Sequence, residues 1–266
     1  KPKNYRETFY GPTLMREALA QSRNVVTVKL LQDIGVDYTI DYARRLGITS
    51  DLTRTLSLAL GASGVSLLEL TRAYSVFANQ GELVEPVFVL SVTDRDGRVL
   101  EEAQADRRRV IEAGTAYLMT SMLESVVQHG TGQKAKALNR PAAGKTGTTN
   151  DTYDAWFIGY TREYIAGVWV GFDDEQPLGK TETGAAAALP IWLGFMQRVL
   201  ANEPIKVFEA PEGIVFAKID AQTGLLPVPE SHKTIFECFK EGTVPVEYSK
   251  RPGEVKETED FLKKDL

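Results

Sequence analysis

The sequence predicts a mixed α/β (α+β) fold in which an antiparallel sheet packs against helices. Two patterns lead to this prediction: helical periodicity fills the first fifty residues, and three strand-like runs follow one another in the second half of the chain. Links as short as those between the runs favour an antiparallel meander whose strands pair in order. The three runs are Ala142–Thr149, Asp154–Tyr160 and Tyr164–Phe172.

The helices are predicted from apolar periodicity and from the residues that begin and end helices. Thr13 and Asn24 are suitable caps for the first two helices, and Ser66 with Glu69 fits the capping-box pattern. Pro190 predicts a kink or a late start in the last helix. The expected helices run from 14 to 19, from Asn24 to Gly35, from Asp37 to Gly47, from Ser66 to Gly81, from Ala113 to Gln128 and from Ala185 to Leu200.

Two further regions complete the predicted organisation. Val87–Thr93 and the residues from Arg98 to Leu100 read as a β-hairpin, because the turn between them contains Asp and Gly. After Asn202 prolines separate short strand-like pieces such as Gly213–Ile219, and a charged tail begins at Lys250. We therefore expect a main domain over 1–202 and a Pro-rich C-terminal extension over 203–266.

Composition excludes several classes of function. The net charge is -5, and Arg107–Arg109, expected as a solvated turn, is the single basic run, so we predict no nucleic-acid partner. One cysteine, Cys238, cannot form an intramolecular disulfide, and with two histidines it cannot build a Cys/His metal cluster. We expect Cys238 and all three tryptophans to be core residues. No metal or other cofactor is expected, and no apolar run reaches the length of a membrane span.

The stretch AAGKTGTTND, Ala142 to Asp151, admits two interpretations. A phosphate-binding Walker A loop needs Gly, four residues and then Gly-Lys-Thr. Counting back from Gly144 reaches Asn139, and Pro141 removes an amide that such a loop would supply. The nucleotide interpretation is therefore disfavoured.

The same residues make chemical sense as a strand. Alternation along a strand sends Lys145 to one face and Thr146 with Thr148 to the other. Gly147 has no side chain, so an extended peptide could pair with the strand edge while the ammonium and the hydroxyls meet its carboxylate. A bare Lys-Thr-Gly is a weak signal by itself, because any strand end can contain these residues.

The sequence around this stretch resembles the transpeptidase domain of class A penicillin-binding proteins. The resemblance rests on Ala142–Asp151 followed by Asp154–Tyr160, and on blocks that continue in the family's order from Gly11 to about Arg198. Penicillin-binding proteins carry a Ser-x-x-Lys, Ser-Asp-Asn and Lys-Thr-Gly set. Here Ser22-Arg23-Asn24 is similar to the second motif and Lys145-Thr146-Gly147 to the third. The other matching blocks are Gly11–Leu14, Ala18–Asn24, Ala59–Ala62, Ala73–Gly81 and Ala166–Asp173.

The resemblance implies a reaction and a role for each matching residue. A serine attacks a stem peptide ending in D-alanyl-D-alanine, and the acyl group passes to a neighbouring stem peptide; β-lactam antibiotics imitate the donor. Ser22 would pass a proton to the leaving amine, and Asn24 would bind the substrate backbone. Lys145 would stabilise the ionised state of Ser22, and Thr146 and Thr148 would hold the substrate carboxylate. The Thr148 amide would be one oxyanion donor.

The chain departs from the family pattern at the nucleophile. No serine is followed by lysine three positions later, so the sequence contains no Ser-x-x-Lys. We expect the nucleophile, its lysine and two strands of the sheet to lie before residue 1, which would leave Tyr164–Phe172 as an apolar edge open to self-association. We further expect this chain alone neither to react with penicillin nor to behave as a well-formed monomer.

Two other functions share some of these features. A serine β-lactamase or D,D-carboxypeptidase has the same three motifs, and a non-catalytic muropeptide-binding domain would suit the missing serine. The continuation Thr149-Asn150-Asp151 and the Pro-rich tail favour the class A synthases over the first of these. By resemblance, the full-length protein would be a periplasmic enzyme anchored in the inner membrane.

Overall fold

The structure is a computed structural model that describes residues 10–174 and 176–250. Its described residues divide into two compact units, one formed mainly by Met15–Pro211 and the other by Pro12–Leu14 with residues 212–250. The charged tail predicted from Lys250 lies outside the described residues, apart from Lys250 itself. Within the described part of the chain, no helix is both long and apolar enough to cross a membrane.

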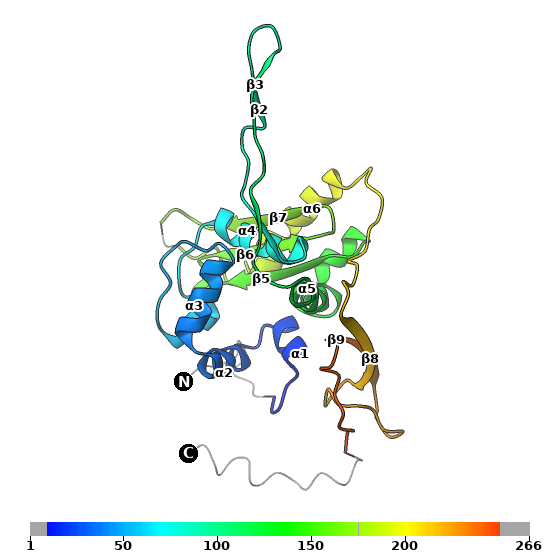
Figure 1. Cartoon of the computed structure of the whole chain (residues 1–266). Coiled ribbons are helices and arrows are strands. Elements are labelled where there is room, and N and C mark those ends of the chain that lie inside the picture. The colour runs from blue at the N-terminus through cyan, green and yellow to red at the C-terminus, as the bar shows by residue number, and fades with distance from the viewer. Residues whose placement is uncertain (1–9, 175, 251–266) are drawn as a thin grey trace. The chain divides into compact units, whose positions relative to one another are not determined.

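The elements follow the predicted order along the chain (Figure 1). The helices are α1 (Met15–Ala20), α2 (Asn24–Ile34), α3 (Val36–Arg45), η1 (Leu56–Leu60), α4 (Leu67–Ala78), α5 (Ala113–Gln128), η2 (Gln133–Leu138), η3 (Asn150–Thr152), η4 (Gly184–Ala188) and α6 (Leu189–Val199). The strands are β1 (Glu82–Val84), β2 (Ser91–Thr93), β3 (Val99–Glu102), β4 (Arg107–Arg109), β5 (Ala143–Thr148), β6 (Ala155–Tyr160), β7 (Ile165–Val170), β8 (Ile214–Asp220) and β9 (Thr234–Lys240).

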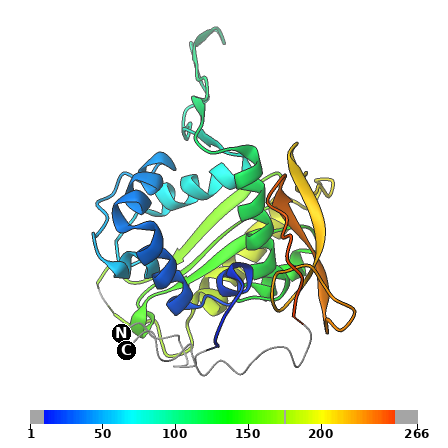
Figure 2. The same ribbon diagram turned by 60° about the horizontal axis from the view of Figure 1, so that its bottom comes forward.

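The central sheet is the predicted antiparallel meander, in the order β5-β6-β7. Its two faces are covered by different helices (Figure 2). Phe157 of β6 packs edge-on against Trp192 of α6 on one face, while Tyr160 bonds to Thr120 of α5 on the other. Residues 157 and 160 are an odd number of positions apart, so their side chains point to opposite faces of the sheet, as the alternation in the sequence predicts. Among the described residues, β5 and β7 are the edge strands of this sheet. Self-association through β7 stays a prediction.

Several local predictions are confirmed. Ser66 and Glu69 form a complete capping box at the start of α4. α5 has the predicted bounds, and α6 starts late, with Pro190 in its first turn after the π-helical turn η4. The hairpin forms between β2 and β3 with shorter strands than expected, and β8 pairs with β9 in the second unit. Cys238 is buried and forms no disulfide.

Three local predictions are wrong. Residue 24 already belongs to α2, so the cap position falls to Arg23 and Asn24 is no N-cap. Arg107–Arg109 is no turn but strand β4, which pairs with β1 and places Arg109 opposite its ion-pair partner Glu82. Trp192 is fully buried, but Trp169 is 37% exposed. The pairing of β4 with β1 is a contact distant in sequence, which no local pattern shows.

A half-buried acid on α5, Glu124, makes stability depend on pH. Burial raises the pKa of Glu124 from 4.5 to about 7, against the opposing charge of Arg16. Because the folded state binds more protons than the unfolded state between these values, stability falls as pH rises from about 4.5 to about 7. Glu124→Gln should therefore stabilise the chain by roughly 1–3 kcal/mol at about pH 8 and much less at about pH 4. Urea denaturation at both pH values measures this, and equal gains at both would contradict the assignment.

Candidate active site

The candidate site begins at the turn between α1 and α2, which carries Ser22. Ser22 has a φ of 54°, in the left-handed region that residues other than glycine rarely adopt. The turn is held by a bond from the Arg23 amide to the Ala18 carbonyl, at 2.8 Å. α1 is itself fixed to α5, because the Arg16 guanidinium donates to the Ser121 carbonyl and the Ser125 hydroxyl. The backbone thus presents an exposed Ser22 hydroxyl on a fixed turn.

Strand β5 carries the second part of the site. The Lys145 ammonium donates to the Ser22 Oγ over 2.8 Å and to the Thr146 carbonyl over 2.9 Å. Two of the residues predicted from separate motifs, 123 positions apart, are therefore in direct contact. Burial lowers the pKa of Lys145 from 10.5 to about 8. At neutral pH a few per cent or more of such an amine is neutral, so it can both accept and donate a proton.

The threonines of β5 lie on the other face of the strand, as alternation predicts. Thr146 and Thr131 share a hydrogen bond between their hydroxyls at 2.7 Å, and the Thr148 hydroxyl accepts one from the Gly184 amide at 3.0 Å. Accepting that bond leaves Thr148 its own O–H to donate. The turn after α5 therefore holds one threonine of β5, and the π-helical turn before α6 holds the other.

Thr131 is a site residue that sequence reasoning missed. Besides its bond to Thr146, its amide donates to the Ala20 carbonyl at 3.0 Å, so one residue joins the end of α1 to β5. The neighbouring Gly130 packs so closely that an added Cβ would lie 2.2 Å from the Ala20 carbonyl oxygen. The sequence signal was the Gly-Thr-Gly run after α5, whose meaning depends on a contact more than one hundred residues away.

Lys145, Thr146 and Thr148 line a cleft of about 880 Å³. One wall consists of β5 with tryptophans of β6 and β7, and the remaining lining comes from α3, the residues between α3 and α4, and α4 itself. Trp156 and Trp169 pack together at 6.4 Å between ring centroids, and the Trp169 indole donates to the Asp154 carboxylate. The cleft is lined by Lys145, Thr146, Gly147, Thr148, Thr149, Asp154, Trp156, Ile158 and Trp169 on the sheet side.

Comparison with known proteins identifies the family. The model of the penicillin binding protein transpeptidase domain matches residues 2–189, and that of the C-terminal domain of penicillin-binding protein 1A matches residues 210–254. The chain belongs to the penicillin-binding protein transpeptidase family. Two curated relatives, penicillin-binding protein 1A of Pseudomonas aeruginosa and of Aquifex aeolicus, are each 38% identical to it. The matches cover 95% and 92% of this chain but 37% and 33% of those proteins.

Solved structures agree with this placement. The crystal structure of penicillin-binding protein 1A from Haemophilus influenzae matches with a TM-score of 0.87 and 30% identity, over 93% of this chain and 43% of that one. PonA1 of Mycobacterium tuberculosis, in complex with penicillin V, matches with a TM-score of 0.68 and 25% identity, over 78% of this chain and 61% of that one. The predicted fold class, that of a penicillin-binding transpeptidase, is confirmed.

Proposed function

We propose that this chain supplies most of the active-site cleft of a D,D-transpeptidase that cross-links peptidoglycan stem peptides and is acylated by β-lactams. The observation that carries the proposal is the 2.8 Å contact between the Lys145 ammonium and the Ser22 hydroxyl. Lys145 lines a cleft beside β5, which is an edge strand of the sheet that the described residues form, and an extended peptide ending in a carboxylate can add there as a further strand.

The Ser22–Lys145 pair suits proton transfer to the leaving group. When the donor peptide is attacked, the departing D-alanine amine needs a proton, and the Ser22 hydroxyl would give it one while drawing another from Lys145. A pKa near 8 makes this exchange nearly balanced at neutral pH. Asn24, two residues beyond Ser22, is our candidate for holding the donor's backbone.

The β5 threonines suit recognition of the donor's carboxylate. The Thr148 hydroxyl retains a proton to donate, and the Lys145 ammonium lies on the same strand. Gly147 exposes backbone between them, and the Thr148 amide is our candidate oxyanion donor. The carboxylate would thus be held by hydroxyls whose positions are fixed by Thr131 and Gly184.

The nucleophile is the part of the reaction that these residues do not supply. No Ser-x-x-Lys occurs in the sequence, and the curated relatives are nearly three times as long as their matches to this chain. We propose that a preceding segment of a longer, periplasmic and membrane-anchored protein carries that motif. In this proposal the chain alone is inactive.

Mass spectrometry after incubation with penicillin tests the proposal. The 266-residue chain should show no adduct, whereas a protein extended upstream to include the first Ser-x-x-Lys should gain one penicillin per molecule. The matched control is the extended protein with that serine replaced by alanine, which should stay unmodified. A stoichiometric adduct on the short chain, or none on the extended protein, would overturn the proposal. Rapid loss of the adduct by hydrolysis would instead favour a β-lactamase or D,D-carboxypeptidase.

A further inference from the structure

Part of the cleft lining that does not belong to the sheet is a loop, beside residues of α3 and α4. This loop, residues 51–65 and here called the wall loop, connects the end of the α3 region to α4 and contains η1. None of its residues is buried, although Gly61 to Val65 line the cleft. Its helix η1 lies against α2, so packing positions one part of the loop. Because no side chain of the loop is fully buried, polar contacts at its ends must supply the rest.

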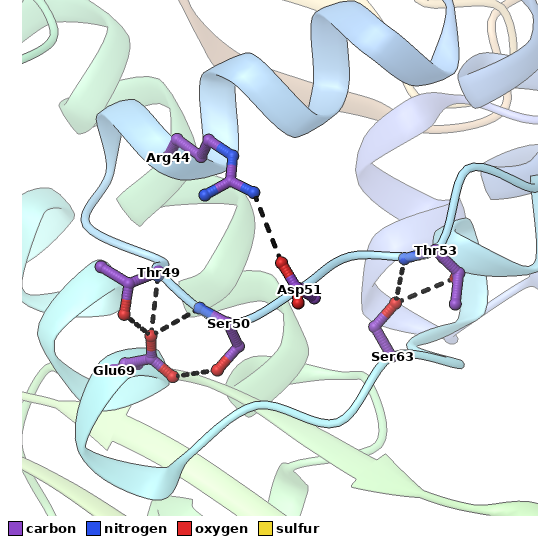
Figure 3. A network of polar contacts seen from close by, with 7 residues as sticks. All are labelled: Arg44, Thr49, Ser50, Asp51, Thr53, Ser63 and Glu69. Atoms are coloured by element: carbon purple, nitrogen blue, oxygen red, sulfur yellow. Dashed lines mark hydrogen bonds and ion pairs between the residues drawn. The ribbon is translucent and has the colours of Figure 1, made fainter.

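A single carboxylate makes most of those contacts (Figure 3). Glu69, in the first turn of α4, accepts hydrogen bonds from the amides of Thr49 and Ser50 at 2.7 and 2.9 Å and from both of their hydroxyls. It also accepts the Ser66 amide at 3.2 Å. Five donors on one side chain join the residues just before the wall loop to the residue just after it.

The electrostatics of this carboxylate match that role. The hydroxyls of Ser50 and Thr49 hold the pKa of Glu69 well below its usual range, so it stays charged and remains a full acceptor at physiological pH. Hydrogen bonds to a charged acceptor are about twice as strong as those between neutral groups. The set is larger than helix capping requires, because Ser66 alone completes the capping box with Glu69.

Other polar contacts of the wall loop are weaker or more exposed. The Ser63 hydroxyl bonds to the amide and the hydroxyl of Thr53, which closes the loop within itself. Arg54 pairs with Asp37 of α3, but their side chains are 71% and 77% exposed, and exposed ion pairs contribute little. The effects of removing the Glu69 bonds and of removing the Arg54–Asp37 pair can therefore be compared.

We propose that Glu69 is a positioning residue for the transpeptidase reaction: through Thr49 and Ser50 it fixes the wall loop opposite β5 and so sets the shape of the cleft. The proposal rests on the function proposed above. In that reaction Glu69 touches no reacting atom. Glu69 acts by keeping Gly61–Val65 at a fixed distance from Lys145 and Thr146. A loosened wall would leave the acylating groups intact but less often correctly arranged.

Two measurements on the extended protein test this proposal: the rate of acylation by a fluorescent penicillin, and amide hydrogen exchange. Glu69→Ala should lower the second-order acylation rate about 10-fold and speed amide exchange over residues 49–65 by at least about 10-fold. Glu69→Gln keeps one acceptor oxygen toward Thr49 but loses the charge and the second acceptor, so it should recover only part of both losses. Thr49→Val with Ser50→Ala removes two of the bonds without touching the helix cap, and should give an intermediate effect.

Two matched controls separate positioning from general stability. Ser66→Ala breaks the helix cap but leaves the bonds to Thr49 and Ser50, so it should lower the melting temperature by roughly 2–4 °C and leave acylation within about twofold. Asp37→Asn breaks the exposed ion pair between α3 and Arg54 of the wall loop. It should change neither the melting temperature nor the acylation rate. The inference is overturned if the Glu69→Ala variant is acylated as fast as the wild type. It is also overturned if Ser66→Ala lowers the acylation rate as much as Glu69→Ala does. If the wild-type extended protein is not acylated at all, the proposed function fails and the inference fails with it.

Discussion

Replacing Lys145 with methionine should nearly abolish acylation by penicillin and, at the same time, make the chain more resistant to unfolding. The loss of acylation follows from the 2.8 Å contact with Ser22, since methionine can neither donate nor accept the proton that this contact would carry. Loss of one general acid–base group lowers rates by about 10²–10⁴-fold. Measured in the extended protein with penicillin, this is the largest effect on activity that the structure predicts.

The gain in stability follows from the depressed pKa of the same residue. Burial lowers the pKa of Lys145 to about 8, so near neutral pH the folded state carries an ammonium that would be better solvated in the unfolded chain. The cost is complete below pH 8 and disappears as pH rises from about 8 to about 10.5, because the unfolded state binds more protons in that window. Lys145→Met should therefore stabilise the chain by roughly 1–3 kcal/mol at about pH 7 and by much less at about pH 10.

Lys134→Met is the matched control, because Lys134 is exposed at the start of η2. It should change neither acylation nor the pH dependence of unfolding. The proposed role of Lys145 would be refuted by a variant that keeps wild-type acylation. A variant that loses acylation and is also destabilised at neutral pH would show that Lys145 contributes to packing rather than carrying a burial cost.

Local patterns were sufficient to predict the sheet and most of the helices. The alternation in β5 placed Lys145 and Thr146 on opposite faces, and the structure confirms it through their different partners, Ser22 and Thr131. Likewise, the Ser66–Glu69 spacing predicted a capping box that forms. Such predictions succeed because each depends on residues within one turn or one strand, where backbone geometry leaves few alternatives.

The features that the sequence could not predict depend on contacts distant along the chain. Glu69 was expected as a capping residue, and its bonds to Thr49 and Ser50 require the α3–α4 connection to fold back on the helix. Trp169 has the pattern of a core residue but lies along the cleft, because a strand alternates in the same way whether its face meets a helix or an opening. The contact between Ser22 and Lys145 was expected from family resemblance and not from any local pattern.

Gly184→Ala should disrupt the site although it adds only one methyl group. Gly184 starts the π-helical turn beneath β5, and an added Cβ would lie 2.3 Å from the Trp156 carbonyl oxygen and 2.4 Å from the Gly147 carbonyl oxygen. Both are backbone atoms of paired strands, so they cannot move aside as a side-chain tip can. We expect a loss of about 1–3 kcal/mol in unfolding free energy, the usual cost of overpacking.

The same displacement should reach the carboxylate site, because the Gly184 amide holds the Thr148 hydroxyl at 3.0 Å. A shift of about 1 Å at such a group can cost about 10²-fold in rate, so acylation of the extended protein should fall further than its stability would suggest. Gly194→Ala is the matched control: Gly194 lies inside α6 with no atom within 4 Å of an added Cβ. It should stabilise the helix by about 0.5–1 kcal/mol and leave acylation unchanged. Equal stability and equal acylation in the two alanine variants would show that the π-helical turn does not support β5.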